Sequence, residues 1–161
     1  MRAVIAAVAL GFFSAQVFAA LPVVPAKDQT ALLKSGDPKL RANKKLAYDF
    51  YRIVLQGRRL DQAEKYMRED YIQHNPNADT GLKGFKAYFE RLGGPQPVPE
   101  LVDGLVAIQA EGDYVTLSLV REYTDAAGQK YTSTWFDMFR IQDDKIAEHW
   151  DPATKPAAPS R

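Results

Sequence analysis

The carboxyl-terminal third of the chain reads KYTSTWFDMFRI at residues 130–141 and IAEHWD at residues 146–151, joined by the turn QDDK. Both segments are rich in aromatic and β-branched residues, which predicts two antiparallel strands. Titratable groups, among them Asp137 and His149, interrupt the apolar runs. Because strands of this composition bury one face, such groups either pair inside a core or line a cavity.

Two further strands are predicted upstream of these segments. Residues 98–109 are apolar with a bend expected at Gly104, and residues 114–124 are rich in Val, Thr, Tyr and Leu. The turns EGD at 111–113 and DAAG at 125–128 separate the strands. Together the segments predict a meander of about four antiparallel strands.

The residues before the meander have helical periodicity. Apolar residues recur at helical spacing in residues 39–55, and Gly57 is the expected carboxyl-terminal cap. A short helix at 62–67 follows a capping-box pattern that starts at Asp61, and a third helix is expected at 82–92. Helices segregated to one side of an antiparallel sheet predict an α+β fold. A strongly curved sheet over these helices would leave a conical cavity.

The amino terminus has the pattern of an export signal. Arg2 precedes an apolar run at residues 3–13, and VFA at 17–19 fits a cleavage site before Ala20. An uncleaved membrane anchor is the alternative, but the run is too short to span a bilayer comfortably. The expected organisation is a signal peptide at 1–19, a linker at 20–37, one domain at 38–152 and a disordered Pro-rich tail at 153–161. This organisation predicts a periplasmic or secreted protein.

Charge and cysteine content say little about partners beyond a few exclusions. The chain has 21 Lys and Arg against 20 Asp and Glu, and it lacks the basic stripe typical of nucleic-acid binding. It has no cysteine, which excludes a disulfide framework. The titratable groups in the apolar strand segments, if they line a cavity, instead indicate a small-molecule ligand or substrate as the expected partner. No nucleic acid is expected as a partner, and no membrane contact is expected after signal cleavage.

Period-two alternation assigns the polar groups of the last two strands to faces. It places Asp137 on one face of the longer strand, and His149 and Asp151 together on one face of the last strand. If both faces line the cavity, these groups converge with His74 of the QHNP turn. Histidines beside carboxylates suit proton transfer, and a carboxylic acid in an apolar pocket can donate a hydrogen bond. The candidate catalytic residues are therefore His74, Asp137 and Asp151.

Other side chains are expected to contact the ligand. Tyr48 or Tyr51 on the first helix could supply a second hydrogen-bond donor to the oxygen of a developing enolate. The candidate substrate-binding residues are Tyr48, Tyr51, Trp135, Phe139 and His149.

Structural alternatives stay open for the catalytic candidates. His74 could cap the turn that follows it, and Asp151 could only end its strand. Asp137 could form a structural ion pair with Arg121 or Arg140.

A metal site is the weaker interpretation of the two histidines and two aspartates. No local spacing such as His-x-x-x-His is present. His149 could equally be a core histidine with satisfied hydrogen bonds. We therefore expect no metal and no other cofactor.

Five short motifs follow one another along the chain: YIQHNP at 71–76, GLKGF at 81–85, EGDYV at 111–115, FDMFR at 136–140 and KIAEHWD at 145–151. In this order they resemble the SnoaL-like branch of the nuclear transport factor 2-like superfamily, over about residues 39–152. The resemblance implies a cone-shaped α+β fold with three amino-terminal helices packed on a curved antiparallel sheet. It also implies a homodimer, which would cover exposed aromatics such as Trp150 and Tyr131.

The resemblance extends to single residues. Asp137 stands where ketosteroid isomerase has a cavity-facing Asp, and His74 lies near the position of the base of that enzyme. Asp151 follows Asp137 by fourteen residues, which resembles the His and Asp pair of polyketide cyclases except that Asp137 stands where the His would be. These departures leave the reaction open.

Two functions fit these features. The first is a cofactor-free lyase or isomerase that uses enolate, aldol-type chemistry on a small carbonyl compound. The second is an exported binding protein that holds an apolar small molecule without reacting. An epoxide-opening hydrolase is a third possibility, but it needs an Asp-Arg-Asp set that this sequence does not place.

Overall fold

Five strands form the sheet of the computed structural model, which describes residues 21–156. They are β1 Met67–Gln73, β2 Leu105–Glu111, β3 Tyr114–Thr124, β4 Lys130–Gln142 and β5 Lys145–Trp150. The last three lie within one residue of their predicted bounds. The turn between β4 and β5 has Asp143 and Asp144 at φ 51° and 55°, a backbone that suits the twist of a two-residue hairpin.

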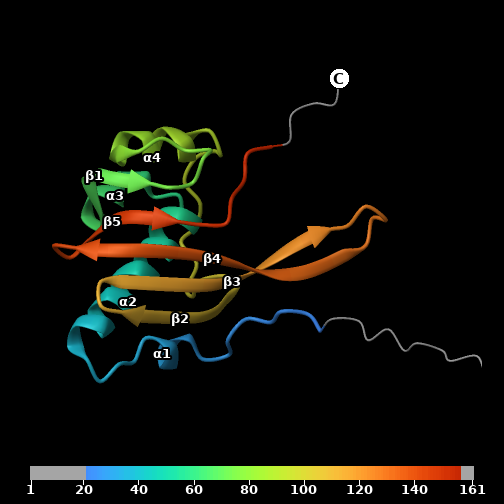
Figure 1. The fold of residues 1–161 in the computed structure, drawn as a ribbon, viewed down its shortest axis with the longest axis horizontal. Coiled ribbons are helices and arrows are strands. Elements are labelled where there is room, and N and C mark those ends of the chain that lie inside the picture. The colour runs from blue at the N-terminus through green and yellow to red at the C-terminus, as the bar shows by residue number, and fades with distance from the viewer. Residues whose placement is uncertain (1–20, 157–161) are drawn as a thin grey trace, which may run out of the picture.

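The strand order is β1-β5-β4-β3-β2, so β5 lies between β1 and β4 (Figure 1). β1 pairs with β5 in parallel, whereas the other pairs are antiparallel. The sheet is therefore mixed, which corrects the expectation of a wholly antiparallel sheet. β2 begins only at Leu105, because Gly104 has φ +75° and interrupts the longer strand expected at 98–109.

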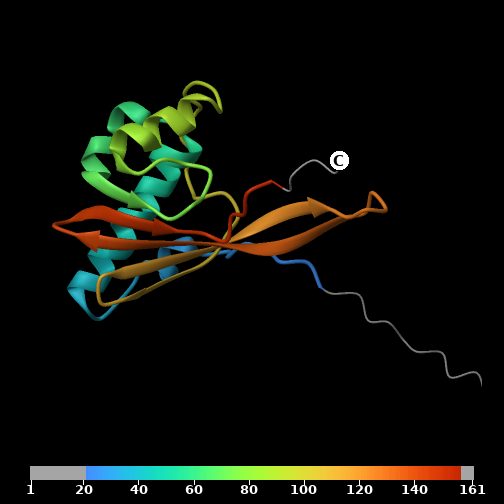
Figure 2. The ribbon, with the colours of Figure 1, turned by 45° about the horizontal axis from the view of Figure 1, so that its top comes forward.

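The helices pack on one face of this sheet. They are α1 Gln29–Leu32, α2 Pro38–Phe50, the π-helix η1 Tyr51–Gln56, the 3-10 helix η2 Leu60–Gln62, α3 Ala63–Tyr66 and α4 Gly81–Glu90. Figures 1 and 2 show α2, α3 and α4 together on the same side of the curved sheet. We call the face towards the helices the inner face. The packing of the helices on this face confirms the predicted α+β arrangement.

The first long helix begins at Asp37, whose carboxylate accepts hydrogen bonds from the backbone N–H groups of Lys39 and Leu40. α2 continues directly into η1, so the helix expected at 39–55 has the predicted length but ends in wider π-helical turns. The expected capping box at Asp61 does not form, because Asp61 lies within η2 and pairs with Arg59.

Gly57 ends η1 for a different reason from the one expected. Its φ is −74°, and the left-handed residue is the following Arg58 at φ 49°. A Cβ at position 57 would lie 2.6 Å from the Ile53 carbonyl oxygen and 2.8 Å from Val98 Cγ2. Glycine is needed here because the chain passes too close for a side chain.

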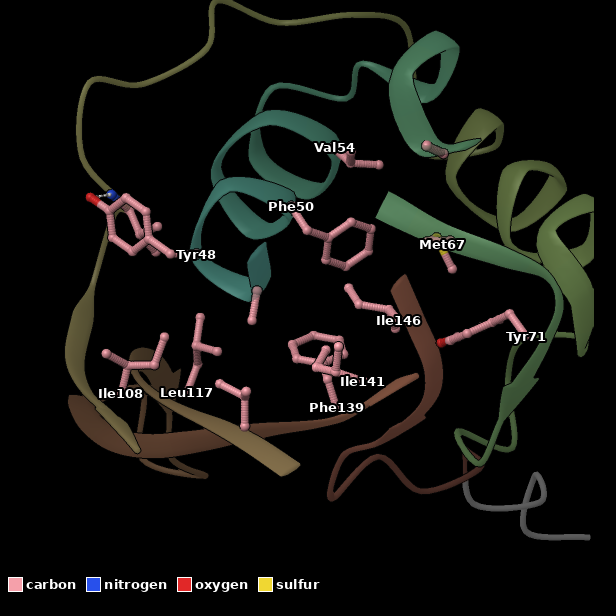
Figure 3. Close-up of a cluster of buried hydrophobic side chains, with 14 of the residues drawn as sticks. Tyr48, Phe50, Val54, Met67, Tyr71, Ile108, Leu117, Phe139, Ile141 and Ile146 are labelled. Atoms are coloured by element: carbon pink, nitrogen blue, oxygen red, sulfur yellow. Dashed lines mark hydrogen bonds between the residues drawn. The ribbon is translucent and has the colours of Figure 1, made fainter. Parts of the chain in front are cut away.

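The core lies between the helices and the inner face (Figure 3). Phe50 of α2 meets Phe139 of β4 edge to face, with ring centroids 5.6 Å apart, and Phe85 of α4 packs beside Phe50 at 5.8 Å. Each ring that is fully buried contributes about 2–3 kcal/mol of hydrophobic stabilisation. These contacts fix α2 and α4 above the sheet.

Part of the expected linker packs against the domain. The Ala26 N–H donates to the Leu105 carbonyl at 2.7 Å, and Gln29 of α1 is buried. The Tyr48 hydroxyl donates to Gln29 Oε1 at 2.8 Å and also accepts from the backbone N–H of Val102. Residues 26–32 are therefore attached to the core instead of spanning free space.

The expected signal peptide at 1–19 lies outside the described residues, as does the end of the expected tail. Among residues 21–156, no helix has both the length and the apolar character required to cross a membrane.

Candidate functional site

A cavity of about 360 Å³ opens between the helices and the inner face of the sheet. One half is apolar and is lined by side chains of η1, α4 and the turn after α4: Leu55, Phe85, Tyr88, Phe89 and Leu92. The other half carries the polar groups of β1, β4 and β5. This volume and this division are typical of sites for small organic molecules.

Asp137 of β4 and His149 of β5 form a buried pair in the polar half. His149 Nε2 lies 2.9 Å from Asp137 Oδ1, and the two residues are 8% and 5% exposed. Phe139 is the register partner of His149, so Asp137 and His149 occupy diagonal positions on neighbouring strands. The indole Nε1–H of Trp135 donates to the same Asp137 oxygen at 3.2 Å.

Gln73 of β1 fixes the second nitrogen of His149. The backbone N–H of Asn75 donates to Gln73 Oε1 at 2.9 Å, which directs the amide oxygen toward the imidazole. His149 Nδ1 lies 2.9 Å from this oxygen and therefore donates to it. His149 Nε2 and Asp137 Oδ1 then share a single proton, as either imidazolium and carboxylate or imidazole and carboxylic acid.

Asp151 follows β5 and places a second carboxylate beside the imidazole. Its Oδ2 accepts from Asn75 Nδ2 at 2.7 Å and lies 3.9 Å from His149 Nε2. Its Oδ1 accepts from the backbone N–H of Ala153 at 2.8 Å. Donors on both oxygens hold the Asp151 carboxylate in place.

Two tyrosines face these carboxylates. Burial, and next the charge of Asp137, raises the pKa of Tyr51 well above its ordinary value. Burial, and next the charges of Asp151 and Asp137, raises the pKa of Tyr71 as well. Both phenols therefore remain protonated and can donate. Figure 3 shows Tyr71 extending from β1 into the space between the helices and the sheet.

His74 lies on the outer face of the sheet, the face away from the helices, so its predicted convergence with Asp137 is wrong. Its Nε2 is 3.1 Å from Glu148 Oε2, and its ring stacks on Trp150 with centroids 4.6 Å apart. Side chains alternate along a strand, and Gln73 takes the inward position. Arg140 also binds Glu148 on the outer face, so it does not form the alternative ion pair with Asp137.

Four of the five predicted substrate-binding residues line the cavity: Tyr51, Trp135, Phe139 and His149. Tyr48 does not, because its hydroxyl is bonded to Gln29 and Val102. Asp137 and Asp151 also line the cavity. Sequence reasoning missed Tyr71, Gln73 and Asn75, although their period-two spacing around His74 is the pattern of an inward strand face.

Asp137, His149 and Asp151 each offer one metal-ligating atom, and these atoms lie within 4.8 Å of one another. One imidazole nitrogen and two carboxylate oxygens are a donor set that zinc accepts, and the Gln73 bond would orient the imidazole. Nε2 is bonded to Asp137 in this geometry, so a cation would have to displace the shared proton.

Comparisons with known proteins agree with this architecture. A family model described as a SnoaL-like domain matches residues 47–149. No curated protein matches the chain.

Several solved structures share the fold. TsrD from Streptomyces laurentii is 22% identical, with a TM-score of 0.50 over 73% of this chain and 90% of that one. A candidate SnoaL-like polyketide cyclase from Jannaschia sp. CCS1 is 14% identical, with a TM-score of 0.51 over 74% and 91%. An LEH-like epoxide hydrolase of M. tuberculosis is 14% identical, with a TM-score of 0.52 over 71% and 84%. At these identities the likeness concerns the fold alone.

Proposed function

This chain belongs to the family of SnoaL-like domains, and from that premise we propose that it is a cofactor-independent lyase or isomerase acting on a small carbonyl compound. The observation that carries the proposal is the buried pair of Asp137 and His149, joined at 2.9 Å on the wall of a cavity of about 360 Å³. Titratable pairs buried in a cleft are typical of proton-transfer sites.

Asp137 is the group that we assign as the base. In the imidazolium and carboxylate form of the pair, its carboxylate takes a proton from the carbon next to the substrate carbonyl. The C–H bond breaks, an O–H bond forms on Asp137, and the electron pair moves to the carbonyl oxygen as an enolate. This role replaces the one expected for His74, which lies on the other face.

Tyr51 and Tyr71 are the donors that we assign to the enolate oxygen. Their hydroxyls are protonated, both side chains line the cavity, and the charges of Asp137 and Asp151 act on both. Fixed donors in a partly dry site stabilise developing negative charge more than water does. Return of the proton from Asp137 to another carbon completes an isomerisation. Attack of the enolate on a second carbonyl carbon completes an aldol-type addition, and its reversal is a lyase reaction.

The test is exchange of α-protons with deuterated water, followed by NMR across a panel of small ketones and aldehydes. We expect exchange with a subset of the panel that fits the cavity, and exchange about 10²–10⁴-fold slower in the Asp137→Asn variant. Saturable binding without exchange of any panel member would favour the alternative, a binding protein for an apolar small molecule.

We also propose a homodimer that forms through the outer face of the sheet. Phe136 of β4 and Tyr114 of β3 lie on this face and are 50% and 45% exposed. Trp150 lies on β5, the strand next to β4. An apolar group of this kind on a sheet favours association. Light scattering should give twice the monomer mass for the wild type and the monomer mass for Phe136→Glu. A monomeric wild type at high concentration would refute this assembly.

Export remains a proposal from the amino-terminal sequence. Sequencing of the protein recovered from the periplasm or the medium should find Ala20 at or near the first position.

A further inference from the structure

Arg121 of β3 lines the same cavity and has no carboxylate partner among the described residues. Its guanidinium carbon lies 3.8 Å from the centroid of the Trp135 ring. The salt bridges of residues 21–156 use other arginines: Arg52, Arg59, Arg68 and Arg140. A cation–π contact holds the guanidinium plane in place but leaves its N–H donors available.

Trp135 connects this cation to the proton-transfer pair. Its ring carries Arg121, and its indole N–H donates to Asp137. Tyr51 is within reach of both charges, since Asp137 raises its pKa while Arg121 lowers it. Arg121 and Asp137 therefore face one space and are kept apart by the indole.

We propose that Arg121 and Trp135 form an anion-binding subsite, so that the substrate is a small carbonyl compound that also carries a carboxylate. A guanidinium binds a carboxylate through two parallel hydrogen bonds, and that geometry is the one its unused donors offer. This inference rests on the proposed function of the cavity and names the class of compound that the cavity takes.

The charges in the cavity also set the orientation of such a substrate. Asp137 and Asp151 repel an anion from the buried end, whereas Arg121 is exposed at the rim and attracts it. The carboxylate of the substrate then lies at Arg121. The carbonyl group reaches the Asp137 end, and the apolar remainder packs on the aromatic half.

The test compares a keto acid with its uncharged amide. The probes are 4-oxo-4-phenylbutanoate and 4-oxo-4-phenylbutanamide, which share the aryl ketone and differ in the charged group. Isothermal titration calorimetry should show that the wild type binds the acid about tenfold or more tightly than the amide, as a charge-assisted bidentate contact predicts.

Arg121→Gln keeps a planar polar side chain but removes the charge. We expect this variant to bind the acid about tenfold more weakly and to bind the amide within about twofold of the wild type. Arg41→Gln is the matched control, because Arg41 is exposed on α2, does not line the cavity and donates to the Ser35 carbonyl. It should leave the affinity for both probes unchanged.

The outcomes separate this inference from the proposed function. Equal affinity of the wild type for acid and amide overturns the anion subsite and leaves the cavity proposal standing. Preference for the acid without α-proton exchange supports the subsite and contradicts the enzymatic proposal. Binding of neither probe contradicts both.

A measurement on the wild type covers the case in which Arg121→Gln does not fold. Raising the ionic strength about tenfold should weaken binding of the acid and leave binding of the amide unchanged, because salt screens an exposed charge pair. Acid binding that is independent of salt would count against the subsite.

Discussion

The sheet carries one histidine–carboxylate pair on each face, and each pair takes one member from the adjacent β5 residues Glu148 and His149. On the inner face, His149 lies 2.9 Å from Asp137, and on the outer face, His74 lies 3.1 Å from Glu148. The two histidines are themselves joined by a backbone hydrogen bond from His74 N to His149 O at 3.0 Å. An imidazole and a carboxylate therefore meet at nearly the same distance in two different environments.

Burial and the remaining partners distinguish the two pairs. The His149 side chain is 10% exposed and that of His74 is 40% exposed. His149 has its second nitrogen on Gln73 and faces a cavity, whereas His74 stacks on Trp150 at the surface. In a medium of low dielectric constant the position of one proton changes the energy of every neighbouring charge, while water screens the outer pair. Chemistry is expected on the inner face and modest stabilisation on the outer face.

The largest expected difference is in the rate of α-proton exchange when the carboxylate of Asp137 or that of Glu148 is replaced by an amide. Asp137→Asn should lower α-proton exchange by a factor of about 10²–10⁴, because the amide cannot accept the proton. Glu148→Gln makes the same change on the outer face and should leave the exchange rate within about twofold, since it lies outside the cavity. NMR exchange rates measure both, with thermal unfolding as the check that each variant is folded. Equal losses in the two variants would remove the functional distinction between the faces.

The next largest effect should come from the residue that orients the inner imidazole. Gln73→Leu removes the acceptor of His149 Nδ1 and should lower kcat about 10- to 100-fold with little change in KM. Gln73→Glu restores an acceptor and should recover part of the rate. Gln109→Leu, at an exposed position of β2, is the control. A change in KM alone would show that Gln73 only binds substrate.

The outer pair should be visible in the pH dependence of stability. The hydrogen bond to His74, with further help from Arg140, lowers the pKa of Glu148 below its ordinary value of 4.5. A carboxyl group with a lowered pKa stabilises the fold above its unfolded-state pKa, and the effect disappears as the pH falls through the folded-state value.

Glu148→Gln should therefore lower the free energy of unfolding by about 1–2 kcal/mol at neutral pH. The difference from the wild type should shrink as the pH falls below 4.5. Urea unfolding at a series of pH values measures it. A difference that grows on acidification would contradict the assigned network.

The smallest effect is expected for His74. His74→Ala should lower the free energy of unfolding by about 0.5 kcal/mol or less, because solvent screens an exposed pair. It should leave α-proton exchange unchanged. A large loss of exchange in this variant, in a folded protein, would return His74 to the catalytic role expected from the sequence.

The sequence predicted the carboxyl-terminal strands well because local chemistry determines them. The turns at 125–128 and 142–145 contain the Asp and Gly residues that hairpins need, and the segments between them are rich in β-formers. The sequence analysis placed Asp137, His149 and Asp151 on the correct face, because it recognised their strands and side chains alternate between the two faces of a strand.

The errors concern β1 and its neighbours. Residues 67–70 read MRED, which is polar because this strand lies at the edge of the sheet, and its partner β5 is distant in the sequence. Without that strand, the inward or outward position of His74 could not be assigned. The sequence analysis also did not predict the π-helical turns of η1. The close approach of Val98 that requires glycine at position 57 is a tertiary contact that no local pattern reports.

The place of β5 between β1 and β4 has a consequence for the order of folding. Gln73 and His149 are separated by 76 residues, as are Asn75 and Asp151, so the loop they close is long. Such non-local pairings form slowly, because the chain must lose loop entropy before the contacts compensate. During synthesis β1 leaves the ribosome early, and the backbone groups that pair with β5 stay unpaired until β5 has been made. The Asp137–His149 pair cannot form until β5 is inserted, so the sheet and the polar half of the cavity are completed in the same step.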